Sequence, residues 1–160
     1  MRPIVKRLSG AAVPLALVAM LCALAYHVLP ASEAARHTVN ELASAHAFSL
    51  GAMGYGADRT QADTFFKLVQ NRHADELLRT LYERGTPEAK LYALCGLRHV
   101  SPRGFPKYAE RFAAEVSTVH TVSGCIGNDR TATEILPQLQ KDVVREVLAL
   151  NKRNEIKPAR

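Results

Sequence analysis

The sequence predicts a mainly α-helical protein built from short antiparallel helical hairpins, and three observations support this prediction. Of its 160 residues, 48% are hydrophobic and 22% are charged, which is the balance of a globular domain rather than a disordered chain. Aromatic residues make up only 6%, so the core must come mainly from leucine, valine and alanine, which suits helices. Beyond residue 60, apolar residues recur with helical spacing. The length suggests one domain.

The first 34 residues have the pattern of an export leader. Three basic residues within the first seven are followed by an uncharged stretch over residues 8–32. This layout is typical of a secretory signal, and Ser32 and Ala34 fit the small subsites of a signal peptidase. Cleavage after Ala34 is the preferred interpretation. The alternative is an uncleaved membrane anchor, because about 20 apolar residues suffice to span a bilayer.

Both interpretations of the leader place the rest of the chain outside the cytoplasm. We therefore expect an exported protein of the periplasm, or a protein anchored in the inner membrane with its domain outside the cytoplasm. A membrane contact is expected only through an uncleaved leader, or weakly through the basic tail at residues 152–160. Four basic residues contribute only marginal binding, at about 1 kcal/mol for each one near an anionic surface.

The formal net charge of +6 is concentrated at the two ends of the chain. Residues 35–151 carry 14 basic and 13 acidic side chains, whereas the tail at 152–160 carries four basic residues and one acidic residue. Nucleic-acid binding normally needs a basic patch within a recognisable module, and the sequence displays neither. We therefore expect no nucleic-acid partner.

Residues 35–60 are predicted to be a linker, with a weak helix at its start and a glycine-rich loop at its end. Gly51, Gly54 and Gly56 interrupt any helix in the loop. Their spacing matches neither the dinucleotide-binding fingerprint nor the phosphate-binding P-loop. The helical domain is then predicted over residues 61–151.

Two helices are predicted at the start of this domain, over residues 61–70 and 74–84. Thr60 has the position of an N-cap for the first helix. The second helix has acidic residues in its first turn and Arg84 in its last, as the helix dipole favours. Gly85 follows as the expected C-terminal glycine. The apolar faces are Ala62, Phe65, Phe66 and Val69 in the first helix, and Leu77, Leu78, Leu81 and Tyr82 in the second.

The helix predicted over Pro87–His99 is expected to lie at the centre of the core. Thr86 and Pro87 have the N-cap and first-turn positions that suit them best. Apolar residues cover nearly the whole circumference of this helix, which is typical of a helix buried on most sides. Gly96 would let a neighbouring helix approach closely.

The pattern changes in the last third of the domain. A short helix is predicted from Phe105 to about Phe112, followed by an extended segment near 116–123 that is rich in valine and threonine. Residues 123–129 are predicted to form turns. A capping box at Thr131 starts one helical turn, and a separate helix is predicted from Pro137 to Asn151, because proline disrupts a helix that begins earlier. The tail at 152–160 is predicted to be polar and frayed.

The run TPEAKLYALCGLRH at Thr86–His99 resembles the second-helix half of a HEAT-type α-hairpin repeat. The chain has room for at most two such units, whereas a repeat stack usually needs about three, so this resemblance implies only partial solenoid character. The leader, together with GYG at 54–56 and SGC at 123–125, is similar to a family of small exported bacterial proteins with no assigned activity. That similarity implies export and carries no mechanism.

Two cysteines follow the leader, Cys95 and Cys125. An even pair in an oxidising compartment favours a disulfide. Closing a loop of about 30 residues contributes roughly 3–4 kcal/mol in the chain-entropy view. The alternative is a pair of buried free thiols, because cysteine is among the residues most often buried.

The sequence offers one catalytic arrangement, in which Cys125 is a nucleophile, His120 its base and Asp129 a neighbour of that base. No family signature surrounds this cysteine. We expect no metal site, because no two histidines have the spacing of a helical metal site and there is no Cys-x-x-Cys. We also expect no cofactor. The scattered histidines after the leader are His37, His46, His73, His99 and His120.

Two functions therefore remain. The preferred one is a non-catalytic exported helical interaction module with an unknown protein partner. The alternative is a small thiol-dependent hydrolase that uses Cys125 and His120. The state of Cys125 separates them, because a cysteine in a disulfide cannot act as a nucleophile.

Overall fold

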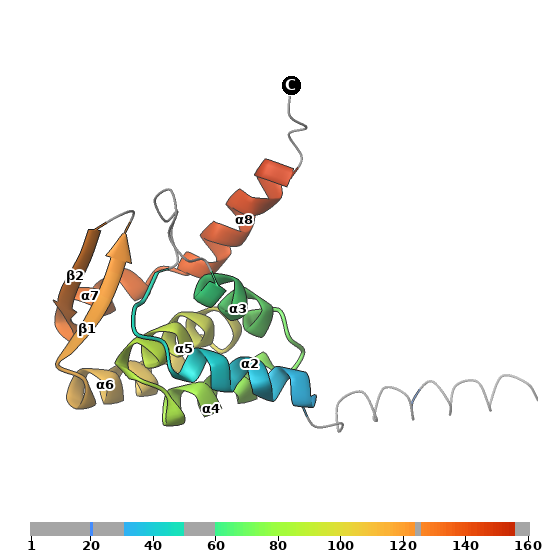
Figure 1. Cartoon of the computed structure of the whole chain (residues 1–160), viewed down its shortest axis with the longest axis horizontal. Coiled ribbons are helices and arrows are strands. Elements are labelled where there is room, and N and C mark those ends of the chain that lie inside the picture. The colour runs from blue at the N-terminus through green and yellow to red at the C-terminus, as the bar shows by residue number, and fades with distance from the viewer. Residues whose placement is uncertain (1–19, 21–30, 50–59, 124–125, 156–160) are drawn as a thin grey trace, which may run out of the picture. The chain divides into compact units, whose positions relative to one another are not determined.

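A computed structural model describes Met20 and residues 31–49, 60–123 and 126–155, with side chains up to residue 149. The chain divides into two compact units, Met1–Pro30 and Ala31–Arg160. The described part of the second unit contains helices α2 to α8 and one antiparallel hairpin, β1–β2 (Figure 1). The prediction of a mainly helical fold with a short extended segment is therefore confirmed.

The predicted leader lies largely outside the described residues. In the part of the chain that the structure describes, no helix combines the length and the apolar character needed to cross a membrane. The uncharged stretch at 8–32 contributes only Met20, Ala31 and Ser32 to that part. Export and anchoring stay predictions.

Helices α4 (Ala74–Arg84) and α5 (Pro87–Val100) form the centre of the core. Thr86 caps α5, because its hydroxyl accepts a hydrogen bond from the Ala89 N–H at 3.2 Å. All residues from Leu91 to Leu97 are buried. The expected burial of this helix on most of its sides is thus confirmed.

Two glycines allow close packing in this region. A Cβ on Gly96 would lie only 2.6 Å from Cδ2 of Leu78, so α4 and α5 meet at this point as expected. Gly85 follows α4 as expected, but its φ of −84° lies outside the left-handed region that favours glycine. Its role is steric instead, since a Cβ there would lie 2.5 Å from the Cβ of Ala89.

Helix α2 (Glu33–Ala43) belongs to the domain rather than to a linker. The hydroxyl of Ser32 accepts a hydrogen bond from the Ala35 N–H at 3.3 Å and caps the helix. Val39 and Leu42 are buried in the common core, so the compact unit starts before the predicted boundary at residue 61. The apolar face of this helix requires a partner, and α4 and α3 (Thr60–Val69) provide it.

The hairpin follows α6 (Phe105–Glu115) and pairs β1 (Thr118–Ser123) with β2 (Ile126–Thr131). Strand β1 confirms the extended segment, whereas the predicted turns at 123–129 are wrong for residues 126–129. Glycine, asparagine and aspartate disfavour strands when taken alone. Pairing with β1 overrides this preference, and the Thr121 hydroxyl adds a hydrogen bond to the Asn128 carbonyl at 3.0 Å.

Helices α7 (Ala132–Leu139) and α8 (Val143–Glu155) divide the chain differently from the prediction. Pro137 lies inside α7 and does not begin a new helix. Its missing N–H leaves the carbonyl of Thr133 without a helical donor, but Thr133 is exposed, so water can satisfy that group.

The first turns of α8 pack on the core through Val144 and Leu148, and the helix then extends away from the rest of this unit (Figure 1). Its first turn is closed by Asp142, whose carboxylate accepts a hydrogen bond from the Arg145 N–H at 3.0 Å. The helix continues to Glu155, so the beginning of the predicted frayed tail is helical, and residues 156–160 lie outside the described residues.

Candidate functional site

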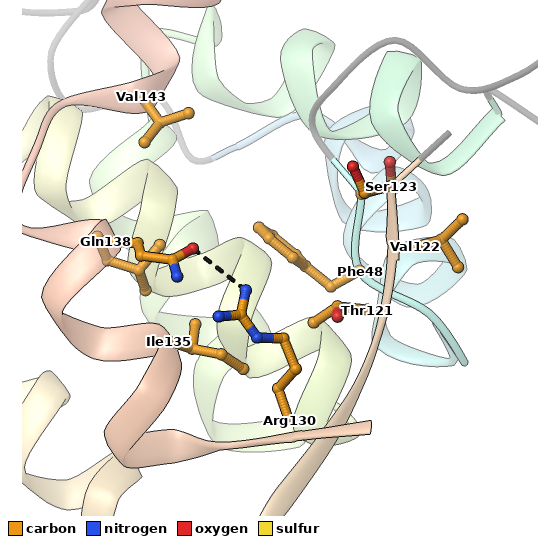
Figure 2. A pocket seen from close by; sticks show the side chains of 10 residues that line it. Phe48, Thr121, Val122, Ser123, Arg130, Ile135, Gln138 and Val143 are labelled. Carbon is orange, nitrogen blue, oxygen red and sulfur yellow. Dashed lines mark hydrogen bonds between the residues drawn. The ribbon is translucent and has the colours of Figure 1, made fainter. Parts of the chain in front are cut away.

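A pocket of about 270 Å³ lies between the hairpin, the segment at 48–49 and helices α7 and α8 (Figure 2). We call it the hairpin pocket. Its apolar lining residues are Phe48, Val122, Ile135, Leu139 and Val143. Its polar lining residues are Ser49, Thr121, Ser123, Arg130 and Gln138.

The wall formed by Phe48 is attached to the edge of β1. The Phe48 N–H donates to the His120 carbonyl at 2.8 Å, and the Val122 N–H donates to the Phe48 carbonyl at 2.9 Å. Phe48 thereby bridges to Thr121 in parallel orientation, on the edge of β1 that β2 does not use. The Phe48 ring also packs on Tyr92 of α5, with 4.8 Å between ring centroids. The pocket wall is therefore tied to both the hairpin and the core.

The backbone of Ser49 is fixed by hydrogen bonds, whereas its hydroxyl makes none to the described residues. The Ser49 N–H donates to the Tyr92 Oη at 3.0 Å, and that hydroxyl donates back to the Ser49 carbonyl at 3.0 Å. Burial raises the pKa of Tyr92 to about 12, so the phenol keeps its proton at neutral pH. Ser49 is only 3% exposed, and its Oγ has no hydrogen-bond partner among the described residues. An unpaired buried hydroxyl costs about 1–3 kcal/mol.

Arg130, near the end of β2, supplies the positive charge of the pocket. Figure 2 shows its side chain reaching toward Gln138, and its Nη1 donates to the Gln138 Oε1 at 3.3 Å. No carboxylate among the described residues forms an ion pair with it. The neighbouring Glu134 is engaged elsewhere, because its carboxylate accepts a hydrogen bond from the Thr131 N–H at 2.9 Å. This bond, with a smaller contribution from Arg130, lowers the pKa of Glu134.

The structure brings together two of the three residues of the predicted catalytic arrangement. His120 and Asp129 are cross-strand partners, and the His120 Nδ1 lies 2.8 Å from the Asp129 Oδ1. Both side chains are open to solvent, with 44% and 75% of their surface exposed. Cys125 lies outside the described residues, between Ser123 and Ile126. A catalytic role for it stays a prediction.

Cys95 lies buried in α5 and has no disulfide partner among the described residues. Burial raises the pKa of this thiol, so it stays protonated at neutral pH and is a poor nucleophile. Its predicted disulfide partner, Cys125, lies outside the described residues, and the bridge stays a prediction. One turn further along α5, the His99 Nδ1 lies 3.0 Å from the Asp142 Oδ2. Sequence reasoning missed this contact between residues 43 positions apart.

The other histidines do not gather into a site. Within the described ranges, no three histidine, cysteine, aspartate or glutamate side chains are grouped in a way that suits a metal ion. Sequence reasoning also missed Ser49, Arg130 and Gln138. They come from three separate segments, and no local pattern marks any of them.

No protein-family model, curated protein or solved structure matches the chain. The resemblance of residues 86–99 to a HEAT-type hairpin, and that of the leader to small exported proteins, therefore stay predictions.

Proposed function

We propose that the protein is a non-catalytic interaction module that acts outside the cytoplasm and contacts a protein partner at the hairpin pocket. The observation that carries this proposal is the composition of the pocket. An apolar wall meets a guanidinium and a buried hydroxyl, and among the described residues the first has no ionic partner and the second no hydrogen bond. Pockets that combine an apolar wall with polar groups able to orient a ligand are typical binding sites.

The same lining argues against catalysis in the pocket. Its hydroxyl groups belong to Ser49, Thr121 and Ser123, and no histidine, carboxylate or cysteine is among the described lining residues. A serine or threonine needs an adjacent base to become a nucleophile. These hydroxyls are therefore better suited to hydrogen bonding with a partner than to attacking one.

Site-specific photo-crosslinking in intact cells tests this proposal. A photoreactive residue at the exposed Gln138 should give one defined adduct, and the same residue at the exposed Lys107 on α6 should not. The substitution Arg130→Gln should remove most of the adduct, whereas Arg103→Gln, at an exposed residue outside the pocket, should keep it. Equal adducts from Gln138 and Lys107, or an adduct that persists in Arg130→Gln, would contradict binding at the pocket.

The first turn of α2 supports the anchored form of the protein over the cleaved one. Cleavage after Ala34 would remove Ser32, whose cap contributes about 1 kcal/mol, and Ala31, which is buried. It would also place a positive α-amino group at the N-terminus of α2, where the helix dipole disfavours it. We therefore propose an inner-membrane anchor with the domain outside the cytoplasm.

The mass of the native protein in a membrane fraction tests the anchor. We expect a species near the full mass of 17.5 kDa, and a reporter fused after Arg160 that is active only in the periplasm. A mature protein that starts at Ala35 would refute the anchor while leaving export intact. A reporter that is active only in the cytoplasm would refute export itself.

The contact between His120 and Asp129 favours a second candidate, a thiol-dependent hydrolase that uses Cys125. A histidine whose Nδ1 faces a carboxylate keeps its Nε2 for a nucleophile. The test is the hydrolysis of a p-nitrophenyl ester by the wild type, Cys125→Ser, His120→Ala and the control His99→Ala. This candidate requires that the first two variants lose the activity and that the control keeps it. A rate that is the same in all four proteins rules it out.

A further inference from the structure

We propose that the hairpin pocket binds a carboxylate that carries a short apolar group, as the last residue of a peptide chain does. This inference rests on the proposed function and adds the chemistry of the ligand. A free aliphatic acid has the same chemistry, so the experiment below separates these two sources.

The Arg130 guanidinium has N–H donors that are available to hydrogen-bond a ligand. A guanidinium has five N–H donors in one plane, and toward the residues that the structure describes this one donates a single 3.3 Å bond, to Gln138. Two of the remaining donors match the two oxygens of a carboxylate in the bidentate arrangement that arginine prefers. Because the described lining residues include no acidic side chain, an incoming carboxylate meets no negative charge in the wall.

Ser49 adds a hydroxyl group to the wall of the same pocket. The residue is 3% exposed, and its Oγ lacks a hydrogen-bond partner among the described residues. The two hydrogen bonds to Tyr92 fix the backbone of Ser49 at this position in the wall. Buried polar groups without a partner are rare in folded proteins. This hydroxyl is closed to solvent, so it can donate a hydrogen bond to a carboxylate oxygen only when the bound ligand moves the wall around it.

The charge and the apolar surface of the pocket match a ligand with one negative charge and an apolar group. Arg130 is the only cationic residue among the described residues that line the pocket, so the pocket matches one negative charge. A phosphate dianion would bring a second charge into a wall formed by Phe48, Ile135 and Leu139, which is unfavourable without a further partner. Figure 2 shows Phe48 and Ile135 beside the Arg130 side chain, where the apolar group of a monocarboxylate would lie.

The test is a titration of the full-length protein in detergent micelles with three probe ligands. Binding is monitored by the NMR signals of the Ile135, Leu139 and Val143 methyl groups and of the Arg130 Nε–H. Three probes are used: 4-methylpentanoate, a hexapeptide with a free C-terminal leucine, and the same hexapeptide with an amidated C-terminus. We expect saturable shifts with the free-acid hexapeptide and affinity at least about tenfold lower for the amidated one.

Three variants complete the experiment. Arg130→Gln should weaken binding of the free-acid peptide at least about tenfold, and Ser49→Ala should weaken it by a smaller factor. Arg103→Gln removes the same charge outside the pocket and should bind as the wild type does. Loss of methyl dispersion in a variant would indicate misfolding, so the free-acid and amidated peptides are also compared on the wild type alone.

The outcomes separate this inference from the proposed function. Binding of the free-acid peptide without binding of 4-methylpentanoate assigns the pocket to a chain terminus, and the reverse assigns it to a small acid. Equal affinity for the free-acid and amidated peptides overturns the carboxylate and leaves an interaction module. No saturable shift with any probe at about 10 mM also overturns the carboxylate, because even a millimolar dissociation constant, worth only about 4 kcal/mol, would be seen at that concentration. The crosslinking experiment then decides the proposed function independently.

Discussion

The α4–α5 centre and the hairpin pocket differ in how far their polar groups are paired by hydrogen bonds. In the centre, the Tyr82 hydroxyl donates to the Tyr108 carbonyl at 3.1 Å, and side chains such as Leu94 are fully buried. At the pocket, counting only partners in the described part of the chain, the Ser49 hydroxyl is unpaired and Arg130 has one long hydrogen bond. The helices therefore supply most of the stability, and the hairpin pocket holds the polar groups that are available to a ligand. Substitutions in the centre should mainly change folding, and substitutions in the pocket should mainly change binding.

Leu94→Ala should cause the largest loss of stability. Leu94 is 0% exposed, and removing such a side chain leaves a cavity that costs about 2–5 kcal/mol. This is a large share of the roughly 5–15 kcal/mol that stabilises a typical domain. Urea unfolding followed by circular dichroism measures it. A loss below about 1 kcal/mol would show that the centre does not dominate stability.

Gly96→Ala should also destabilise the centre, although alanine favours helices. The added Cβ would lie 2.6 and 2.7 Å from the two methyl carbons of Leu78, which is fully buried and has little room to move. Overpacking costs about 1–3 kcal/mol, and the helix preference of alanine offsets at most about 1 kcal/mol. In a Leu78→Ala background the same substitution should cost less, because the clash is gone. A Gly96→Ala variant more stable than the wild type would contradict the close packing.

Tyr92→Phe and Ser49→Ala remove one hydroxyl each and should differ clearly. Without the Tyr92 hydroxyl, the backbone N–H and carbonyl of Ser49 lose their partners, which costs about 1–3 kcal/mol. The Ser49 hydroxyl has no partner within the described ranges, so its removal should leave the free energy of unfolding unchanged or slightly raise it. Equal losses in the two variants would mean that the Ser49 hydroxyl has a partner in the folded protein.

Arg130→Gln should have the smallest effect on stability. Its side chain makes one long hydrogen bond and no ion pair among the described residues, so unfolding should change by no more than about 0.5 kcal/mol. Chemical denaturation of the same samples used for the titration gives this value. A loss near that of Tyr92→Phe would place Arg130 in the structural framework, and its effect on binding could then not be assigned to the ligand.

The helical part of the fold was predictable because its signals are local. Thr86 and Pro87 mark the start of α5 within the sequence, and the apolar circumference of that helix indicates its burial. Strand β2 was not predictable, because Gly127 and Asn128 form a strand only when β1 is beside them. Pro137 misled the prediction, since the exposed face of a helix tolerates a missing N–H that a buried face would not.

The candidate site was less predictable than the fold. His120 and Asp129 lie nine residues apart on one hairpin, so their contact follows from a local turn. The hairpin pocket combines Ser49, Arg130 and Gln138, which meet only after the helices have packed. Nothing near Ser49 in the sequence indicates that its hydroxyl is buried without a partner.

The bridge between Phe48 and β1 has a consequence for the order of folding. Ser49 and Tyr92 are 43 positions apart, and the partners of Phe48 on β1 are further along the chain still. Closing such long loops costs entropy that only the packed helices between them can repay, so contacts of this type form late. During synthesis, the segment at 48–49 emerges well before the strand that holds it. We therefore expect the hairpin pocket to acquire its shape last, after the helical centre is in place.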